Sequence, residues 1–390
     1  MFSLRAHVQP YAWGSTTAFP ELLGLPETAA PQAELWLGAH PSLPADVEID
    51  GCWARLDDAI RRDPGRWLGR RVQERFGDVL PFLMKVLAAD APLSLQAHPS
   101  QAQAQRGYAD EERARIPVGS PARTYRDPNH KPEIICALTD FHALCGYRSV
   151  DAIRNMFAGF GDDELAARCN DVLVEKPDAD GLRKVTGALL QSERGACRRL
   201  LNLVRNGGAE DDVAARAAML DDRYPGDPGV LVALLLNDVM LRPGEALFLG
   251  PGNLHAYLHG VGVEVMANSD NVLRGGLTPK HVDVDELLVV LDPQPGEIGR
   301  VVSFDENAGA VTRWPVPVDD FELLKVAPGG RVVTVEVDGP AILLCTEGTL
   351  DVSADGTLRL TRGASAIAAA TDLITIEGDG VVFLSRVGGR

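Results

Sequence analysis

The chain has 390 residues, of which 45% are hydrophobic and 24% are charged, and its mean hydropathy is -0.03. This composition is typical of a globular protein with two or three domains. The formal net charge of -17 excludes non-specific binding to nucleic acid, because a polyanion would be repelled. There are only six lysines, so Lys131 and Lys280 draw attention in the polar motifs where they occur.

The cysteines and the hydropathy pattern predict a compartment. The six cysteines lie at 52, 136, 145, 169, 197 and 345 without a close pair, which indicates free thiols in a reducing environment. The first fifteen residues lack the apolar core of a signal peptide. The apolar run 231–241 is interrupted by Asn237 and Asp238, so it is no membrane span. We therefore expect a cytoplasmic protein that does not bind membranes.

The first third of the chain alternates short strands with one helix. Residues 4–13 and 33–42 have β-forming residues that end at proline turns, and residues 57–76 have helical spacing. Residues 80–100 form two apolar runs around an Ala-Asp-Ala-Pro turn. In the second run Gln96 and His98 are two positions apart, so a strand would place both side chains on one face.

A second strand entry follows a polar, Ala/Arg-rich stretch that predicts a helix and loop over residues 100–124. In residues 125–138, Pro132 lacks an N–H and marks the start of a strand that opens with Glu133.

From Ser149, an N-cap type residue, helical spacing continues to residue 228, and β texture then returns. The predicted fold is mainly β with a helical insertion. Residues 1–148 and 229–315 form the two parts of one β domain, residues 149–228 an all-α domain, and residues 316–390 an antiparallel sandwich. The sequence near residue 360 weakly resembles residues 241–257 but has no counterpart of His255. This indicates a second jelly roll that binds no metal.

Two imidazoles and two oxygen donors are candidates for one divalent metal site, for which zinc is the default and manganese, iron, cobalt or nickel are alternatives. The candidate ligands are Gln96, His98, Glu133 and His255. A neutral glutamine beside a single carboxylate would leave a zinc site with net positive charge, which suits polarising a sugar oxygen. The alternative reading is ordinary turn and surface residues, since a His before a proline is often only a turn residue.

The stretch 250–280 adds acids and cations near His255. Glu264 or Asp270 could move a proton, whereas Arg274, Lys280 and Lys131 suit a phosphate or an enediolate. Taken singly, each could equally be a satisfied carboxylate or a surface ion pair. No P-loop or dinucleotide fingerprint is present, so nucleotide chemistry is not expected.

Five motifs in order resemble the class I mannose-6-phosphate isomerases, bacterial members in particular. They are VQPYAWG (8–14), LSLQAHPS (93–100), YRDPNHKPEI (125–134), LGPGNLHAYL (249–258) and EVMANSDNVLRGGLTPKHVD (264–283). Gly275, where many members have alanine, is a mild variation.

The resemblance implies a cupin-type jelly roll in which Gln96, His98, Glu133 and His255 bind one Zn²⁺ per chain. It also implies interconversion of mannose 6-phosphate and fructose 6-phosphate through a cis-enediol, within mannose metabolism or the supply of GDP-mannose. Arg274 falls on the family's catalytic arginine. Lys131, Glu264, Asp270 and Lys280 fall on its other active-site positions, with Lys280, Arg274 and Lys131 facing the substrate.

Several points stay open at this stage. Glu264 and Lys131 are both candidates for the base that moves the proton between carbons 1 and 2. The substrate could be another sugar phosphate, handled by a metal-dependent cupin isomerase or epimerase, or the protein could be a non-catalytic sugar-binding cupin. An iron dioxygenase would prefer two histidines and one carboxylate with open positions, and it fits less well because of Gln96 and the basic cluster. We expect a monomer whose partner is a small sugar phosphate.

Overall fold

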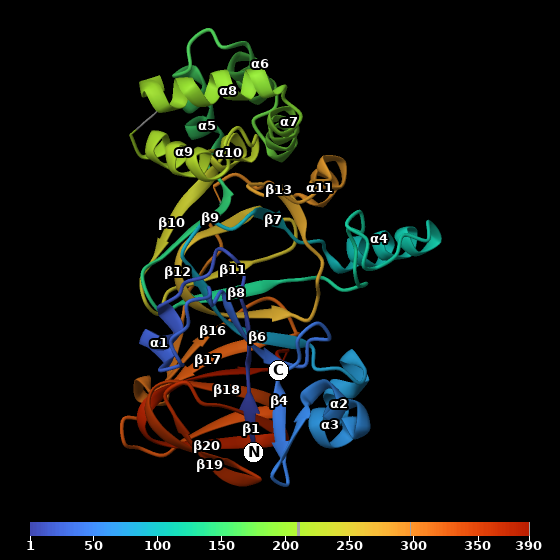
Figure 1. Cartoon of the computed structure of the whole chain (residues 1–390), viewed down its shortest axis with the longest axis vertical. Coiled ribbons are helices and arrows are strands. Elements are labelled where there is room, and N and C mark those ends of the chain that lie inside the picture. Colours follow the sequence, from blue (N-terminus) through green and yellow to red (C-terminus); the bar gives the residue numbers. More distant parts are fainter. Residues whose placement is uncertain (209–210, 297, 390) are drawn as a thin grey trace.

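The structure, a computed structural model, describes residues 1–208, 211–296 and 298–389. It is elongated, with helices at one end, a β unit in the middle and a second β unit at the other end (Figure 1). None of the described helices combines the length and the apolar character that a membrane span needs.

The middle unit is an antiparallel sheet that folds over on itself around one long strand, β12. Its strands are β2 (His7–Gln9), β3 (Glu34–Gly38), β6 (Phe82–Ala89), β7 (Leu95–Ala97), β8 (Glu133–Ala137), β9 (Phe141–Tyr147), β10 (Leu236–Leu241), β11 (Ala246–Leu249), β12 (His255–Ala267), β13 (Leu273–Gly276) and β14 (Arg300–Val301). The first half of β12 pairs with β7 and β9, and the second half pairs with β6 and β8. The strand therefore belongs to both layers and closes the unit.

The bend of β12 depends on a glycine. Gly260 has φ of 116°, and a Cβ atom there would lie 2.5 Å from the carbonyl oxygen of Asp140. Only glycine meets both conditions, because L side chains avoid positive φ. Because of this bend, the half of β12 with His255 and the half with Glu264 lie in the two layers of the same unit.

Helices fill the predicted insertion and the short stretch that follows it to Ala233, and they cap the middle unit (Figure 1). They are α5 (Val150–Ala158), α6 (Glu164–Glu175), α7 (Ala179–Leu190), α8 (Arg194–Leu203), η1 (Val204–Gly208), α9 (Asp211–Arg223) and α10 (Gly229–Ala233). Ser149 caps α5 as predicted, since its side chain accepts from the backbone N–H of Ala152. The apolar faces of these helices share one core with Leu95, Leu254 and Leu273. The helices therefore pack directly beside β7, β12 and β13.

The second sheet contains the β-rich end of the chain. Its strands are β1 (Phe2–Arg5), β4 (Asp46–Ile49), β5 (Cys52–Arg55), β15 (Phe304–Glu306), β16 (Val311–Trp314), β17 (Glu322–Val326), β18 (Val333–Ala354), β19 (Gly356–Thr361) and β20 (Ser365–Arg386). A short 3-10 turn, η2 (Asn307–Gly309), joins β15 to β16. The short runs predicted after residue 318 are indeed β, but several of them join into the long strands β18 and β20.

One feature of this sheet was not expected. β1, β4 and β5 come from the first 55 residues, yet β1 pairs with β20 and β4 pairs with β1 and β5. The beginning of the chain thus completes the sheet formed by its end. The domain boundaries at 148, 228 and 315 stay predictions.

The remaining helices lie outside the two sheets, and α4 projects away from the middle unit (Figure 1). They are α1 (Ala18–Leu23), α2 (Leu56–Arg62), α3 (Pro64–Phe76), α4 (Gln101–Arg113) and α11 (Val284–Val290). The single helix expected over residues 57–76 is divided at Asp63, because the residue before a proline avoids the helical region. Asp63 then caps α3 by accepting from the N–H of Arg66.

Candidate metal centre and active site

Three predicted ligands converge inside the middle unit. Within the described residues, His98, Glu133 and His255 form the group able to hold a metal, and their donor atoms all lie within 4.8 Å of one another. Glu133 Oε2 is 3.3 Å from His98 Nε2 and 3.5 Å from His255 Nε2. All three residues are at most 2% exposed, so solvent does not satisfy them.

The hydrogen bonds of the two histidines point their free nitrogens at this position. His98 Nδ1 donates to the carbonyl oxygen of Asn271 at 2.8 Å, and His255 Nδ1 donates to that of Asn253 at 3.1 Å. Each neutral ring then carries a lone pair on Nε2, as a metal ligand must. Both Nε2 atoms and Glu133 Oε2 are buried without a hydrogen-bond partner. Such orphaned atoms are costly unless an ion satisfies them, so the residues fit a bound cation.

Electrostatics keep His98 and Glu133 in their metal-binding forms. Burial, aided by the nearby Lys131, lowers the pKa of His98 to about 4 despite the opposing effect of Glu133. Burial alone would raise the pKa of Glu133, but Lys131 and His98 hold it well below its usual value. Lys131 Nζ lies 2.9 Å from Glu133 Oε1, so the other carboxylate oxygen is left for the metal.

Gln96, on β7, lies between two other predicted site residues in the strand register. It lies directly opposite His255 on one side and opposite Arg274 on the other. Directly opposed residues of antiparallel strands project from the same face. The strand β7 ends at Ala97, so His98 follows the strand rather than belonging to it. The register therefore agrees with a fourth ligand and a catalytic arginine beside it.

Glu264 is more enclosed than the sequence indicated. It is 2% exposed, accepts a hydrogen bond from Tyr257 Oη at 3.0 Å through Oε1, and lies 3.3 Å from Lys85 Nζ through Oε2. Burial raises the pKa of Glu264, and Lys85 opposes this effect. Both carboxylate oxygens are thus engaged by protein groups.

Lys85 is a site residue that the sequence reading missed. Its ammonium also lies 3.8 Å from Glu34 Oε2 and 5.0 Å from the ring centroid of Trp36. Burial would lower the pKa of Lys85, but Glu34 and Glu264 together raise it above its usual value. The available signal was weak: a single lysine inside the apolar run FLMKVLAA.

Asp270 lies at the more open side of the site, with its side chain 40% exposed. Ser42 Oγ donates to Asp270 Oδ2 at 3.2 Å, and His40 Nε2 is 3.6 Å from Asp270 Oδ1. His40 itself is 3% exposed. The turn after β3 therefore orients this carboxylate, a contact between residues more than 200 positions apart.

Two predicted cations gather with a third that the sequence reading did not single out. Burial and Arg126 lower the pKa of Arg274, and burial, Arg274 and Arg126 lower that of Lys280. In the described part of the chain, none of these three cations has a carboxylate within 4 Å, although the chain is strongly acidic overall. A cluster of unpaired cations is suited to an anionic ligand such as a phosphate.

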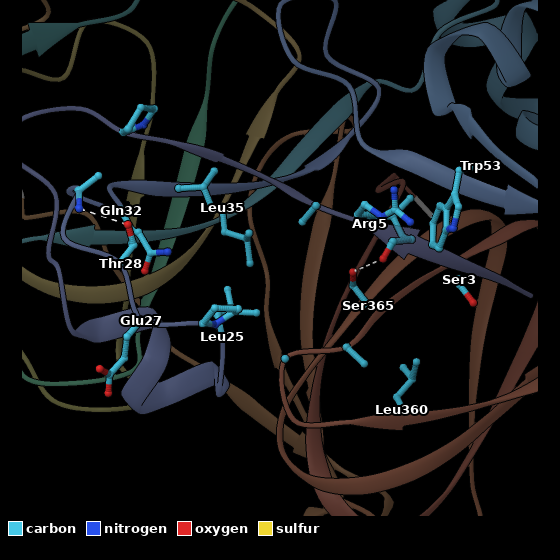
Figure 2. Close-up of a pocket in the computed structure, with 18 of the residues that line it drawn as sticks. Ser3, Arg5, Leu25, Glu27, Thr28, Gln32, Leu35, Trp53, Leu360 and Ser365 are labelled. Atoms are coloured by element: carbon cyan, nitrogen blue, oxygen red, sulfur yellow. Dashed lines mark hydrogen bonds between the residues drawn. The ribbon is translucent and has the colours of Figure 1, made fainter.

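A separate cavity lies away from this site. It has a volume of about 720 Å³ and is lined by residues of β1, β3, β5, β19 and the segment after α1, including Leu25, Leu35 and Leu360 (Figure 2). At its wall the Arg5 guanidinium stacks on Trp53, 3.9 Å from the ring centroid. None of the predicted site residues lines it, so it is separate from the metal group.

Comparison with known proteins agrees with the motifs. The model of the type I phosphomannose isomerase catalytic domain matches residues 1–150, and that of the type I C-terminal region matches residues 313–357. The mannose-6-phosphate isomerase of Escherichia coli K12 is 38% identical over 379 residues, or 96% of each chain. The human enzyme of the same name is 32% identical and covers 97% of this chain and 95% of its own.

Solved structures show the same fold. A crystal structure of mannose 6-phosphate isomerase with zinc bound has a TM-score of 0.91 and 36% identity, and covers 100% of this chain and 99% of its own. A single-residue variant of phosphomannose isomerase from Salmonella typhimurium has a TM-score of 0.92 at 36% identity, with full coverage of both chains. The predicted mainly β, cupin-type fold with a helical insertion is confirmed. The chain belongs to the type I phosphomannose isomerase family.

Proposed function

We propose that this protein is a zinc-dependent isomerase that interconverts mannose 6-phosphate and fructose 6-phosphate. The observation that carries the proposal is the buried group of His98, Glu133 and His255, with three orphaned donor atoms, beside a cluster of unpaired cations. Relatives of this name cover nearly the whole chain, and a zinc-bound structure of such an enzyme has the same fold.

The metal would be held by His98, Glu133 and His255, with Gln96 as the fourth ligand. When bound there, zinc supplies a positive charge that stabilises negative charge developing on substrate oxygens. Gln96 leaves that charge undiminished, because its amide is neutral. Glu133, whose second oxygen faces Lys131, connects the metal position to the cationic side of the site.

The cations bind the sugar phosphate and stabilise the reaction. Arg274, next to Gln96 in the sheet register, stabilises the enediolate, whereas Lys280 holds the phosphate. Asp270, oriented by Ser42 and His40, bonds to the sugar hydroxyls at the open side.

We assign the proton transfer to Lys131 rather than to Glu264. The two oxygens of Glu264 are occupied by Tyr257 and Lys85, whereas the amine of Lys131 is beside a metal ligand and uses one contact, to Glu133. To act as the base, Lys131 must first lose its ammonium proton to solvent; the neutral amine then takes the proton from carbon 2 of the open-chain aldose and returns it to carbon 1. The hydroxyl proton on oxygen 2 moves to oxygen 1, so the atoms balance.

The test is a coupled assay for fructose 6-phosphate formed from mannose 6-phosphate, on the purified protein, after chelation, and after zinc is restored. We expect activity that disappears with the chelator and returns with zinc, and at most trace activity on glucose 6-phosphate. A folded, zinc-loaded protein without activity would contradict the proposal. Comparison of Lys131→Met with Glu264→Gln then tests the base, since only the lysine variant should lose exchange of the carbon 2 proton with solvent.

We further propose that the enzyme works as a monomer in the cytoplasm. All six cysteines are free and five of them are buried, which agrees with a reducing compartment. Light scattering on the purified protein and fractionation of the cells that make it test these two points.

A further inference from the structure

The second β unit contacts the loop that carries Lys131. Asp320, in the segment between β16 and β17, faces His130, and its oxygens Oδ1 and Oδ2 lie 3.1 and 3.0 Å from His130 Nε2. The two residues are 190 positions apart, and Asp320 is only 9% exposed. A carboxylate can only accept, so the proton of a neutral His130 ring sits on Nε2 and points at Asp320.

The segment that carries Asp320 is held in place by a buried neighbour and by a backbone hydrogen bond. Its neighbour Phe321 is fully buried in the core that also contains Trp314 and Leu323. The carbonyl oxygen of Asp319 accepts from the N–H of Gly388 at 3.1 Å, which ties the segment to the end of the chain. The carboxylate therefore has a fixed position set by the C-terminal sheet.

The residue after His130 is Lys131, which belongs to the proposed active site. Successive side chains of an extended segment point in opposite directions. His130 is directed to the C-terminal unit while Lys131 is directed to Glu133 in the metal group. Movement of one side chain would be passed to the other through the shared backbone.

Other contacts hold the same loop but come from the middle unit. Gln101 accepts from the N–H of His130 at 3.1 Å and donates to the carbonyl of Pro128 at 2.7 Å. The side chain of Asn271 bonds to the backbone of Arg126 at 2.7 Å and of Asn129 at 2.8 Å. These bonds fix residues 126–130 at the backbone, whereas Asp320 is the partner of the His130 ring.

We propose that Asp320 is a positioning residue of the active site, which acts through His130 to hold Lys131 against the metal group. This inference rests on the proposed isomerase function. It gives the C-terminal sheet a part in turnover, although that sheet contributes no group to the reacting atoms.

The experiment compares Asp320→Asn with Asp319→Asn in the full-length, zinc-loaded protein. Asp319 is the adjacent acid, is half exposed and pairs with Arg75 on α3 instead of with the loop. We expect Asp320→Asn to lower kcat by about 10- to 100-fold with a smaller change in KM, because small misplacements of a catalytic group are costly. Zinc content should be unchanged, and hydrogen exchange should rise in residues 126–132. Asp319→Asn should leave all of these at the wild-type values.

A second pair of variants separates positioning from chemistry at His130. His130→Gln keeps an N–H donor that can reach Asp320, whereas His130→Ala removes it. We expect the glutamine variant to retain most of the turnover and the alanine variant to lose as much as Asp320→Asn. In the double variant Asp320→Asn/His130→Ala the losses should not add.

Three results would overturn the inference: wild-type kcat in a folded Asp320→Asn, wild-type kcat in His130→Ala, or equal losses in His130→Gln and His130→Ala. The last would make His130 a chemical group rather than a link. If Asp320→Asn does not fold, the two His130 variants decide alone. An inactive wild-type protein would refute the isomerase proposal instead, so the two failures are distinguishable.

Discussion

The two β units of this protein bury different side chains. The middle unit encloses ionisable groups, among them Lys85, His98, Glu133, His255 and Glu264. The core of the C-terminal sheet is made mainly of valine, leucine, isoleucine and alanine, such as Val335, Leu343 and Ile374. Among the described residues of that sheet, Arg386 is a buried charge, and it is paired with Glu322.

This difference in buried side chains indicates that the middle unit carries the chemistry and that the C-terminal sheet contributes stability. Buried charges give little net stability, because their desolvation offsets their attraction. A protein therefore keeps them where chemistry needs them, and stability must come from apolar burial elsewhere. Substitutions in the middle unit should mainly change zinc binding and turnover, whereas those in the C-terminal core should mainly change the free energy of unfolding.

The largest effect is expected at a metal ligand. Glu133→Gln should lose bound zinc, and turnover should fall on the order of 10³-fold, because the metal contributes several kcal/mol to the transition state. Elemental analysis and the isomerase assay measure both quantities. Glu347→Gln, at an exposed position of β18, serves as the control and should keep zinc and activity. A Glu133→Gln protein with full zinc would contradict the assigned ligand set.

The next effect separates turnover from metal binding. Arg274→Ala should lower kcat by about 10²- to 10³-fold, as removal of a group that stabilises an anionic intermediate does. Its zinc content should equal that of the wild type. Arg359→Ala on the C-terminal sheet, where the arginine is largely exposed, should change neither quantity. Zinc loss in Arg274→Ala would show that the arginine supports the metal site instead.

A smaller side chain in the apolar core of the C-terminal sheet should lower stability and leave turnover unchanged. Leu343→Ala should reduce the free energy of unfolding by about 2–5 kcal/mol, because it removes fully buried apolar contacts and leaves a cavity. Denaturant titration measures this loss, and kcat of the folded protein at 25 °C should remain near the wild-type value. Leu373→Ala, at a half-exposed position of the same sheet, should stay within about 0.5 kcal/mol. If both leucine variants lost kcat equally, the two units would not divide their roles as described.

The smallest effect concerns His40, whose pKa burial lowers to about 4 despite the opposing charge of Asp270. Between pH 4 and the ordinary histidine pKa near 6.5, the unfolded chain binds a proton there that the folded protein does not. Stability therefore falls as the pH falls through this window, by at most about 1.4 kcal/mol per pH unit from this residue.

His40→Asn should reduce that slope in denaturant titrations of the metal-free protein from pH 4 to 7. Asparagine at the exposed His259 should leave the slope unchanged. Equal slopes in wild type and His40→Asn would mean that His40 is not buried in its neutral form.

Much of the site could be predicted because its residues lie in short local motifs. Pro132 marks the strand that opens with Glu133, and the proline-glycine turn at 251–252 delivers His255. Gln96 and His98 are only two positions apart, so they are near each other along the chain, although only Gln96 belongs to β7. The all-helical stretch was predictable as well, since apolar residues at helical spacing need no distant partner to be recognised.

What could not be predicted depends on pairing between distant segments. Lys85 reads as one polar residue in an apolar strand, and its place between Glu34 and Glu264 follows only from the register of β3, β6 and β12. The engagement of Glu264 by Tyr257 and Lys85 likewise follows from this pairing, and it is the reason that we propose Lys131 as the base.

The sequence by itself determined the candidate ligands, the cations that suit a phosphate and the succession of strands and helices, because these features are written in local spacing and residue chemistry. Only the tertiary structure decided that β1, β4 and β5 complete the C-terminal sheet, that Arg126 joins Arg274 and Lys280, and that Asp320 reaches His130. Strand register and long-range contacts result from packing of the whole chain, so no local pattern specifies them.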